Sequence, residues 1–337
     1  MSINKNYKPS PKEQLSVEQI FNDLIKGNVR ALSEAITLIE SKRSEDHANA
    51  IDLINKCLPH SGNSIRIGIT GVPGVGKSTF IEALGEYIIQ STGKKVAVLA
   101  IDPSSKVSKG SILGDKTRMQ KLSANEKAFI RPSASAGSLG GVANATRESI
   151  LLCEAAGYEV ILIETVGVGQ SETEVAEMVD FFLLLMLAGA GDELQGIKRG
   201  IMEMADAIFI NKAEGDNLKN SEKAATQYRS AIHLFPPKEN LWTPVVDICS
   251  AIESKNIDKV WSVVDEFYRS TTNSGMFSQV RAKQNEYWFV KNTELLIQQK
   301  IFTNDELLKL HEELKQKVKL GEISPLVASV EFVNKVF

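Results

Sequence analysis

Along most of the chain, short apolar runs alternate with longer stretches in which apolar residues recur every three or four positions. The short runs predict strands and lie at residues 65–70, 96–101, 128–131, 160–164, 181–187, 207–210 and 245–248. The longer stretches predict helices, for example over residues 142–156, 218–234 and 257–268. Because apolar strands joined by crossover helices are typical of parallel sheets, the pattern predicts an α/β fold with a doubly wound, mainly parallel sheet.

Helical patterns flank this alternating region on both sides. Ser16 and Gln19 have the spacing of a capping box, and apolar residues then recur at helical intervals as far as Pro59. After Thr272 the strand-like runs stop, while helical periodicity continues with mixed charge. We therefore predict three parts: an N-terminal helical extension over 1–60, an α/β domain over 61–272 and a C-terminal helical arm over 273–337.

The first apolar run leads into a loop with the spacing Gly-x-x-x-x-Gly-Lys-Ser, and a helical pattern follows the loop. A strand, this loop and a helix in that order are the context that a P-loop requires, which disfavours a chance glycine turn. Backbone N–H groups of such a loop surround phosphate oxygens at the helix N-terminus. Lys77 is expected to reach the β- and γ-phosphates, and the Ser78 hydroxyl is expected to bind Mg²⁺. The predicted phosphate-binding residues are Gly71, Gly74, Val75, Gly76, Lys77, Ser78 and Thr79.

Acidic residues stand at the ends of two predicted strands. Asp102 follows the second apolar run, and Glu164 ends the fourth. Ligands of parallel α/β sheets bind at the carboxyl ends of the strands, and carboxylate oxygens are suitable direct or water-bridged ligands of Mg²⁺. A single carboxylate in such a place can instead cap a helix, but two of them beside a P-loop predict a magnesium–triphosphate site.

Two further segments are candidates for switches that respond to the γ-phosphate. Gly167, three residues after Glu164, is placed to donate its backbone N–H to the γ-phosphate. Loss of that phosphate on hydrolysis would remove the contact and release the loop. The glycine-flanked segment 110–119 carries Asp115 and Arg118 and is interpreted as a second mobile segment. A plain helical connector is the alternative for that segment.

The sixth apolar run ends in Asn211-Lys212-Ala213-Glu214, and the seventh leads to Ser250-Ala251. In an Asn-Lys-x-Asp arrangement, the carboxylate accepts the guanine N1–H and 2-amino groups, Asn fixes the N7 side, and the Lys stem covers the ring. The Ser-Ala turn supplies a backbone N–H to O6. Adenine would present a lone pair to the carboxylate, which is a costly buried mismatch. Glu214 replaces the usual Asp and is one methylene longer.

Composition excludes several classes without changing this interpretation. The net charge of −3 and the pI near 6.0 disfavour a nucleic-acid partner. The apolar run 181–191 is shorter than the roughly 20 residues of a membrane-spanning helix, and the first 15 residues lack the apolar core of a secretory signal. Three cysteines and four histidines are scattered along the chain, which predicts buried thiols and no zinc or nickel cluster. We expect a cytoplasmic protein without a membrane partner.

Taken together, these motifs resemble the methylmalonyl-CoA mutase-associated GTPases, the family of MeaB, of the human protein of cobalamin A-type methylmalonic aciduria and of the bacterial proteins once called ArgK. The resemblance covers nearly the whole chain. The segments that carry it are residues 71–79, 100–105, 110–119, 131–133, 138–141, 164–171, 195–198 and 211–213. Position 214 departs from the family pattern.

The resemblance implies a GTPase chaperone that gates delivery of adenosylcobalamin to a B12-dependent acyl-CoA mutase and protects or reactivates it. Ser78, Asp102, Asp115 and Glu164 would form the Mg²⁺ environment, with Asp115 in switch I and Gly167 in switch II. The segment 189–200 is similar to the third switch of the family. The residues implied in catalysis are Lys77, Asp102, Asp115, Glu164 and Gly167, and those implied in coupling to the mutase are Gln195 and Lys198.

The resemblance also implies that the C-terminal arm makes a homodimer, although such an arm can fold back on its own domain. No side chain is an obvious base or water-orienting glutamine, so slow hydrolysis accelerated by a partner is expected. Two other functions are alternatives. A nickel-type metallochaperone GTPase would need a His-rich tract or cysteine ligands near the switches. A transport-linked ATPase or kinase, the old assignment of ArgK-like proteins, is disfavoured by the guanine motif.

Overall fold

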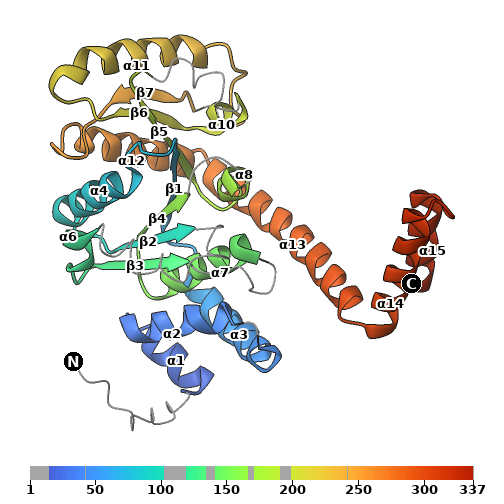
Figure 1. Cartoon of the computed structure of the whole chain (residues 1–337). Coiled ribbons are helices and arrows are strands. Elements are labelled where there is room, and N and C mark those ends of the chain that lie inside the picture. The colour runs from blue at the N-terminus through green and yellow to red at the C-terminus, as the bar shows by residue number, and fades with distance from the viewer. Residues whose placement is uncertain are drawn as a thin grey trace, which may run out of the picture. The chain divides into compact units, whose positions relative to one another are not determined.

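The computed structural model describes residues 15–41, 43–101, 119–133, 141–165, 171–189, 199–240 and 242–336. The chain divides into two compact units, Met1–Val280 and Arg281–Phe337. The first unit contains the sheet and the motif residues, and the second consists of helices (Figure 1).

A seven-stranded parallel sheet forms the centre of the first unit. Its strands are β1 (Ile65–Gly71), β2 (Val96–Ile101), β3 (Ala128–Ser133), β4 (Val160–Thr165), β5 (Phe181–Leu187), β6 (Ala207–Asn211) and β7 (Val245–Ile248). The order across the sheet is β3-β2-β4-β1-β5-β6-β7, so β1 lies between β4 and β5. This confirms the predicted fold class, and each apolar run of the sequence forms a strand because both of its faces are buried.

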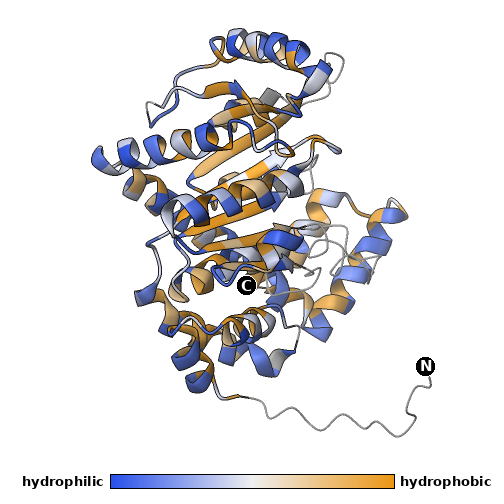
Figure 2. Cartoon of the chain, turned by 90° about the vertical axis from the view of Figure 1, so that its left-hand side faces the viewer, coloured by the Kyte–Doolittle hydropathy of each residue, from blue (hydrophilic) through white to orange (hydrophobic). Residues whose placement is uncertain are grey.

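Helices cover both faces of this sheet (Figure 1). The helices of the first unit are α1 (Val17–Leu24), α2 (Val29–Ile39), α3 (Ser44–Cys57), α4 (Lys77–Thr92), α6 (Gln120–Ser123), α7 (Gly141–Ala155), α8 (Ser171–Ala176), α10 (Arg199–Met204), α11 (Leu218–Ile232) and α12 (Ile257–Asn273). Buried side chains of α4, α6 and α12 form one core with alternate residues of the strands. Helices α7 and α8 contact the strands, and α2 and α3 pack on α7. The strands are the most apolar part of the unit in Figure 2.

The N-terminal helices form the layer that the sequence predicts. The Ser16 side chain accepts the Gln19 N–H and the Gln19 side chain accepts the Ser16 N–H, so the capping box is confirmed. Arg131 of β3 donates at 2.5 Å to Glu40, the residue directly after α2, which ties this layer to the sheet. Cys57 at the end of α3 is a buried free thiol, and burial raises its pKa to about 11.

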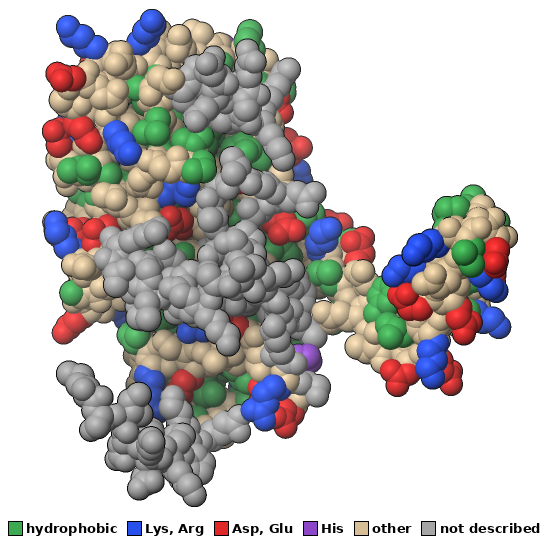
Figure 3. Space-filling view, in the orientation of Figure 1, with side chains coloured by type: hydrophobic (Ala, Val, Ile, Leu, Met, Phe, Trp, Pro, Cys, Tyr) green, Lys and Arg blue, Asp and Glu red, His purple; other side chains and the backbone are tan. Residues whose placement is uncertain are grey.

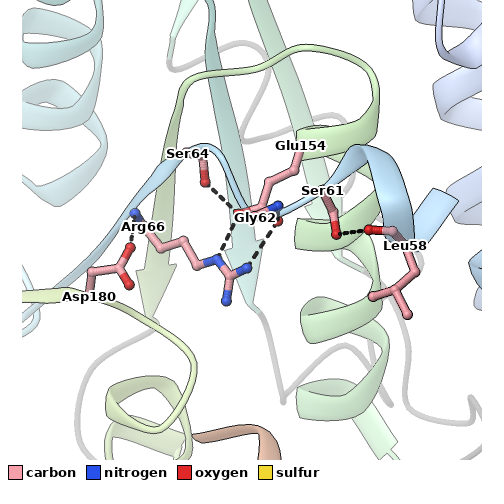
Figure 4. Close-up of polar contacts among 7 residues, drawn as sticks. All are labelled: Leu58, Ser61, Gly62, Ser64, Arg66, Glu154 and Asp180. Carbon is pink, nitrogen blue, oxygen red and sulfur yellow. Dashed lines mark hydrogen bonds and ion pairs between the residues drawn. The ribbon is translucent and has the colours of Figure 1, made fainter. Parts of the chain in front are cut away.

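A buried polar cluster fixes α7 to the amino end of β1 (Figure 4). The Glu154 side chain, 1% exposed, accepts from Ser64 Oγ at 2.6 Å, from Gly62 N at 2.8 Å and from two nitrogens of Arg66 at 2.9 and 3.0 Å. Asp180 accepts the Arg66 backbone N–H at 2.8 Å. The buried carboxylate is thus neutralised and hydrogen-bonded, and β1 is held at the end opposite to the P-loop.

The second unit is helical, as the sequence predicts for the end of the chain. Helix α13 (Met276–Phe302) leads into it, and α14 (Asp305–Lys319) and α15 (Pro325–Val336) pack against each other. The rings of Phe302, His311 and Phe332 contact one another within this unit. Within the part of the chain that the structure describes, no helix is long and apolar enough to span a membrane.

Candidate nucleotide site

The P-loop connects the carboxyl end of β1 to the start of α4. Gly76 has left-handed backbone angles (φ 90°, ψ 36°) directly before the first residue of α4, a conformation that favours glycine. A Cβ atom at Gly71 would lie 2.4 Å from the Leu185 carbonyl oxygen of β5. Gly76 therefore allows the tight turn into α4, and Gly71 allows the loop to pass close to β5. The first N–H groups of a helix have no carbonyl partner within the helix, and anion binding at this end uses those groups.

Lys77 lies across this loop. Its Nζ donates to the Gly71 carbonyl oxygen at 2.9 Å. Burial lowers the pKa of Lys77 below its ordinary value, while the negative charges of Glu164 and Glu172 oppose that shift. An ammonium group has three N–H donors, so Lys77 can keep the Gly71 contact and still donate to phosphate oxygens.

Ser78 and Glu164 meet between α4 and β4. The Ser78 Oγ donates to Glu164 Oε1 at 3.0 Å. These are hard oxygen ligands of the kind that Mg²⁺ prefers, and the lone pairs of the Ser78 hydroxyl stay available while its O–H donates to Glu164. The described residues contain no group of three acidic, His or Cys side chains that alone could hold a metal. Ser78 and Glu164 fit part of the coordination sphere of an ion whose remaining ligands include phosphate oxygens.

Asn211 connects three parts of the site from the end of β6. Its Nδ2 donates to the Val75 carbonyl of the P-loop at 2.9 Å, and its Oδ1 accepts the Ala251 N–H at 3.1 Å. The side chain is 1% exposed. The Ser-Ala motif predicts that the Ala251 N–H donates to the guanine O6. In the structure this N–H donates to the Asn211 side chain, and its contact with a base stays a prediction.

Glu214 and Ser250 are brought together next to Asn211. The Ser250 hydroxyl donates to the Glu214 carboxylate and accepts the Glu253 N–H at 3.1 Å. Lys212 lies between Asn211 and Glu214 and adopts a left-handed backbone conformation (φ 59°). The longer side chain of Glu214 is thus in contact with the Ser-Ala turn, which is where the sequence motif predicts the base.

Several predicted site residues lie outside the described residues, and the structure neither brings them to the site nor separates them from it. They are Asp102, Asp115, Gly167, Gln195 and Lys198. The residues that the structure does bring together are the P-loop with Lys77, the Ser78–Glu164 pair, and Asn211 with Glu214 and Ser250.

Three buried polar residues beside the site are missing from the sequence-based predictions. Glu172 in the first turn of α8 is 1% exposed, and its charge acts on Lys77. The Thr165 hydroxyl donates to the Thr70 hydroxyl at 2.8 Å. The sequence gives only a weak signal for them. Thr70 and Thr165 directly adjoin Gly71 and Glu164, but the motifs assign no role to either threonine or to Glu172.

A parallel sheet whose central strand ends in this loop, with Ser78 on a strand-end carboxylate and Asn211 on the loop backbone, defines a P-loop nucleotide-binding protein. The model of the family described as methylmalonyl Co-A mutase-associated GTPase MeaB matches residues 32–306. The chain belongs to this family, and it is a GTPase.

Named relatives agree with this assignment. GTPase ArgK of Escherichia coli K12 is 48% identical over 302 residues, covering 90% of this chain and 91% of the relative. The mitochondrial methylmalonic aciduria type A homolog of Mus musculus is 42% identical over 323 residues, covering 93% of this chain and 76% of the relative. A solved crystal structure of a protein named LAO/AO transport system kinase superposes with a TM-score of 0.77 at 39% identity, covering 97% of this chain and 99% of that one.

Proposed function

We propose that this GTPase is a chaperone of a B12-dependent acyl-CoA mutase of the methylmalonyl-CoA mutase type. GTP binding and hydrolysis control the delivery of adenosylcobalamin to the mutase. They also control the protection and reactivation of the mutase. The observation that carries the proposal is the family match over 32–306, since that family is described as mutase-associated. The name of the mouse relative, which refers to methylmalonic aciduria, supports the same client.

Within the site, the residues have distinct proposed roles toward Mg²⁺–GTP. Lys77 donates to the β- and γ-phosphates, and Ser78 and Glu164 hold the metal together with Asp102 and Asp115. Bound Mg²⁺ neutralises charge on the phosphate oxygens. The Gly167 N–H binds the γ-phosphate and responds to its loss. Because no side chain is assigned as a base, hydrolysis is slow until the client accelerates it.

Guanine selectivity rests on the Asn211, Glu214 and Ser250 cluster. A carboxylate at position 214 accepts the N1–H and 2-amino donors of guanine, and adenine offers neither donor. The Ser250 contact supports this role because it holds the Glu214 carboxylate beside the turn that begins at Ala251. Lys212 covers the base with its stem.

Coupling to the mutase runs through Gln195 and Lys198. They lie between β5 and α10 in the sequence, and α10 contacts α8, which follows the Gly167 segment. A partner that binds one nucleotide state more tightly shifts the equilibrium between the two states only by the difference in its binding free energies, typically about 1–3 kcal/mol. Lys198 and Gln195 are assigned to those differential contacts.

The protein is also proposed to form a homodimer through its C-terminal arm and to act in the cytoplasm. The second unit exposes large apolar side chains on α15 and the turn before it, among them Leu320 (70%) and Leu326 (75%). Green hydrophobic side chains interrupt its charged surface in Figure 3. Phe302, Leu314 and Phe332 line an apolar hollow of about 430 Å³ there. Apolar surface of this kind favours a protein contact.

One alternative has a specific observation in its favour, which is the likeness to a solved structure named as a transport system kinase. The guanine cluster disfavours an adenine nucleotide, so a displacement assay separates the two functions. A fluorescent guanine nucleotide should be displaced by GTP and GDP in the presence of Mg²⁺ and not by ATP at the same concentration. Displacement by ATP as efficient as by GTP would reject the base assignment and favour the kinase.

A further inference from the structure

The buried hydroxyl pair Thr70–Thr165 lies directly under the phosphate site and has no part in the function described above. Thr70 precedes the P-loop glycine Gly71, and Thr165 follows Glu164. The two side chains are 1% and 0% exposed, and their oxygens are 2.8 Å apart. A buried side-chain hydrogen bond between two strand ends limits the movement of one strand end relative to the other.

The pair lies on the opposite face of the sheet from the Ser78–Glu164 contact. Alternate residues of a strand point to opposite faces. Ile69 on β1 and Leu162 on β4 belong to the core formed with α4, so Glu164 shares that face, where it meets Ser78. Thr70 and Thr165 are one residue further along and face the side of α7 and α8. The end of β4 is therefore held from both faces.

The backbone pairing shows why this second contact matters. On the β2 side, the register continues to Ile101 opposite Thr165. On the β1 side, the register ends one residue earlier, with Ile69 opposite Glu164. The hydroxyl pair extends the connection between β1 and β4 by one residue. This residue pair lies directly before the P-loop on β1 and directly after Glu164 on β4.

We propose that Thr165, held by Thr70, is a positioning residue that fixes the Glu164 carboxylate against Ser78 for Mg²⁺–nucleotide binding. This inference rests on the proposed role of Glu164 toward the metal. Thr165 itself touches neither the nucleotide nor the ion. Loss of its hydroxyl leaves the P-loop amides, Lys77 and the guanine cluster in place, so the effect is confined to the response to Mg²⁺.

The test compares Thr165→Val, Thr165→Ser and the double variant Thr70→Val/Thr165→Val in the full-length protein. Binding of a fluorescent GDP analogue is measured in EDTA and across a Mg²⁺ titration, together with the thermal unfolding midpoint. We expect Thr165→Val to raise the half-saturating Mg²⁺ concentration roughly tenfold, with unchanged GDP affinity in EDTA. Thr165→Ser keeps the hydroxyl and restores the wild-type titration.

The double variant separates positioning from stability. Removing both hydroxyls leaves no orphaned polar group, so the unfolding midpoint recovers toward the wild-type value. The connection between the strands is still missing, so the weak response to Mg²⁺ persists. Thr271→Val is the matched control, since it removes a buried hydroxyl that bonds only within α12 at Phe267 and Tyr268. It lowers stability without changing the titration.

Two results overturn the inference. One is a wild-type Mg²⁺ titration for Thr165→Val, and the other is a titration that follows the unfolding midpoint across all variants. The variant Glu164→Gln separates an error in the proposed metal role of Glu164 from an error in the positioning role of Thr165. If Glu164→Gln binds Mg²⁺ and GDP like the wild type, the metal role of Glu164 is wrong; if it is impaired while Thr165→Val is not, the positioning role alone is wrong.

Discussion

At the scale of single residues, Asn211 connects the P-loop to the Ser250–Ala251 turn of the described nucleotide site. It is buried at the end of β6, and it joins the Val75 carbonyl of the P-loop to the Ala251 amide. The phosphate and base elements are thus fixed to one another by the protein itself. Lys77 belongs to the phosphate part of the site and Glu214 to the base part, and we make a separate prediction for each.

Lys77→Ala should weaken GTP binding at least about 100-fold, because it removes a charged donor directed at the phosphates from a partly buried site. Titration with a fluorescent GTP analogue measures the loss. Lys94→Ala is the control, since Lys94 is an exposed lysine paired with Glu159 away from the loop. Wild-type affinity in the Lys77 variant would show that this ammonium group does not face the phosphates.

Glu214→Ala should abolish discrimination between GDP and inosine diphosphate, because hypoxanthine lacks the 2-amino donor that this carboxylate accepts. Ser250→Ala should reduce the discrimination by a smaller factor, on the order of threefold to tenfold, since it removes the hydroxyl that donates to Glu214. Competition assays with both nucleotides measure the ratio, and Glu222→Ala on α11 is the control. Unchanged discrimination in Glu214→Ala would place the guanine-reading group elsewhere.

At the scale of elements, the strands were predictable and the helix ends less so. Each buried strand is an uninterrupted apolar run, whereas α12 extends to Asn273 beyond the apolar positions that predict it as far as residue 268. Its last turn is polar, so it leaves little periodic signal. The P-loop, Ser78 and Glu164 follow from motifs. The Glu154–Arg66 cluster and the Thr70–Thr165 pair do not, because their residues belong to no motif that assigns them a partner.

The Glu154 cluster predicts how strongly α7 depends on β1. Glu154→Ala should lower the free energy of unfolding by about 3–5 kcal/mol, because it leaves the partly buried Arg66 guanidinium without the carboxylate that neutralises it. Denaturant titration measures the change. The exposed pair Arg30–Glu34 supplies the control, and Arg30→Ala should cost less than about 1 kcal/mol. Equal effects of the two variants would contradict the structural role of the cluster.

At the scale of the whole molecule, the chain combines a GTPase unit with a helical unit that exposes apolar surface. Leu326→Asp with Val330→Asp on α15 should convert the proposed dimer to a monomer with unchanged GDP affinity, since every nucleotide motif lies in the first unit. Light scattering on the full-length protein measures the mass. Exposed Lys335→Asp on the same helix is the control. A dimer that persists in the double variant would place the interface on another surface.

The most direct measurement of the proposed function is the rate of GTP hydrolysis with increasing amounts of an adenosylcobalamin-dependent methylmalonyl-CoA mutase. A chaperone of that enzyme predicts a saturable rise of at least about tenfold, because the partner completes a site that is slow alone. Lys198→Ala should bind GTP normally and lose this rise. A wild-type rate that stays at its basal value at saturating mutase, while GTP is still hydrolysed, would contradict the account.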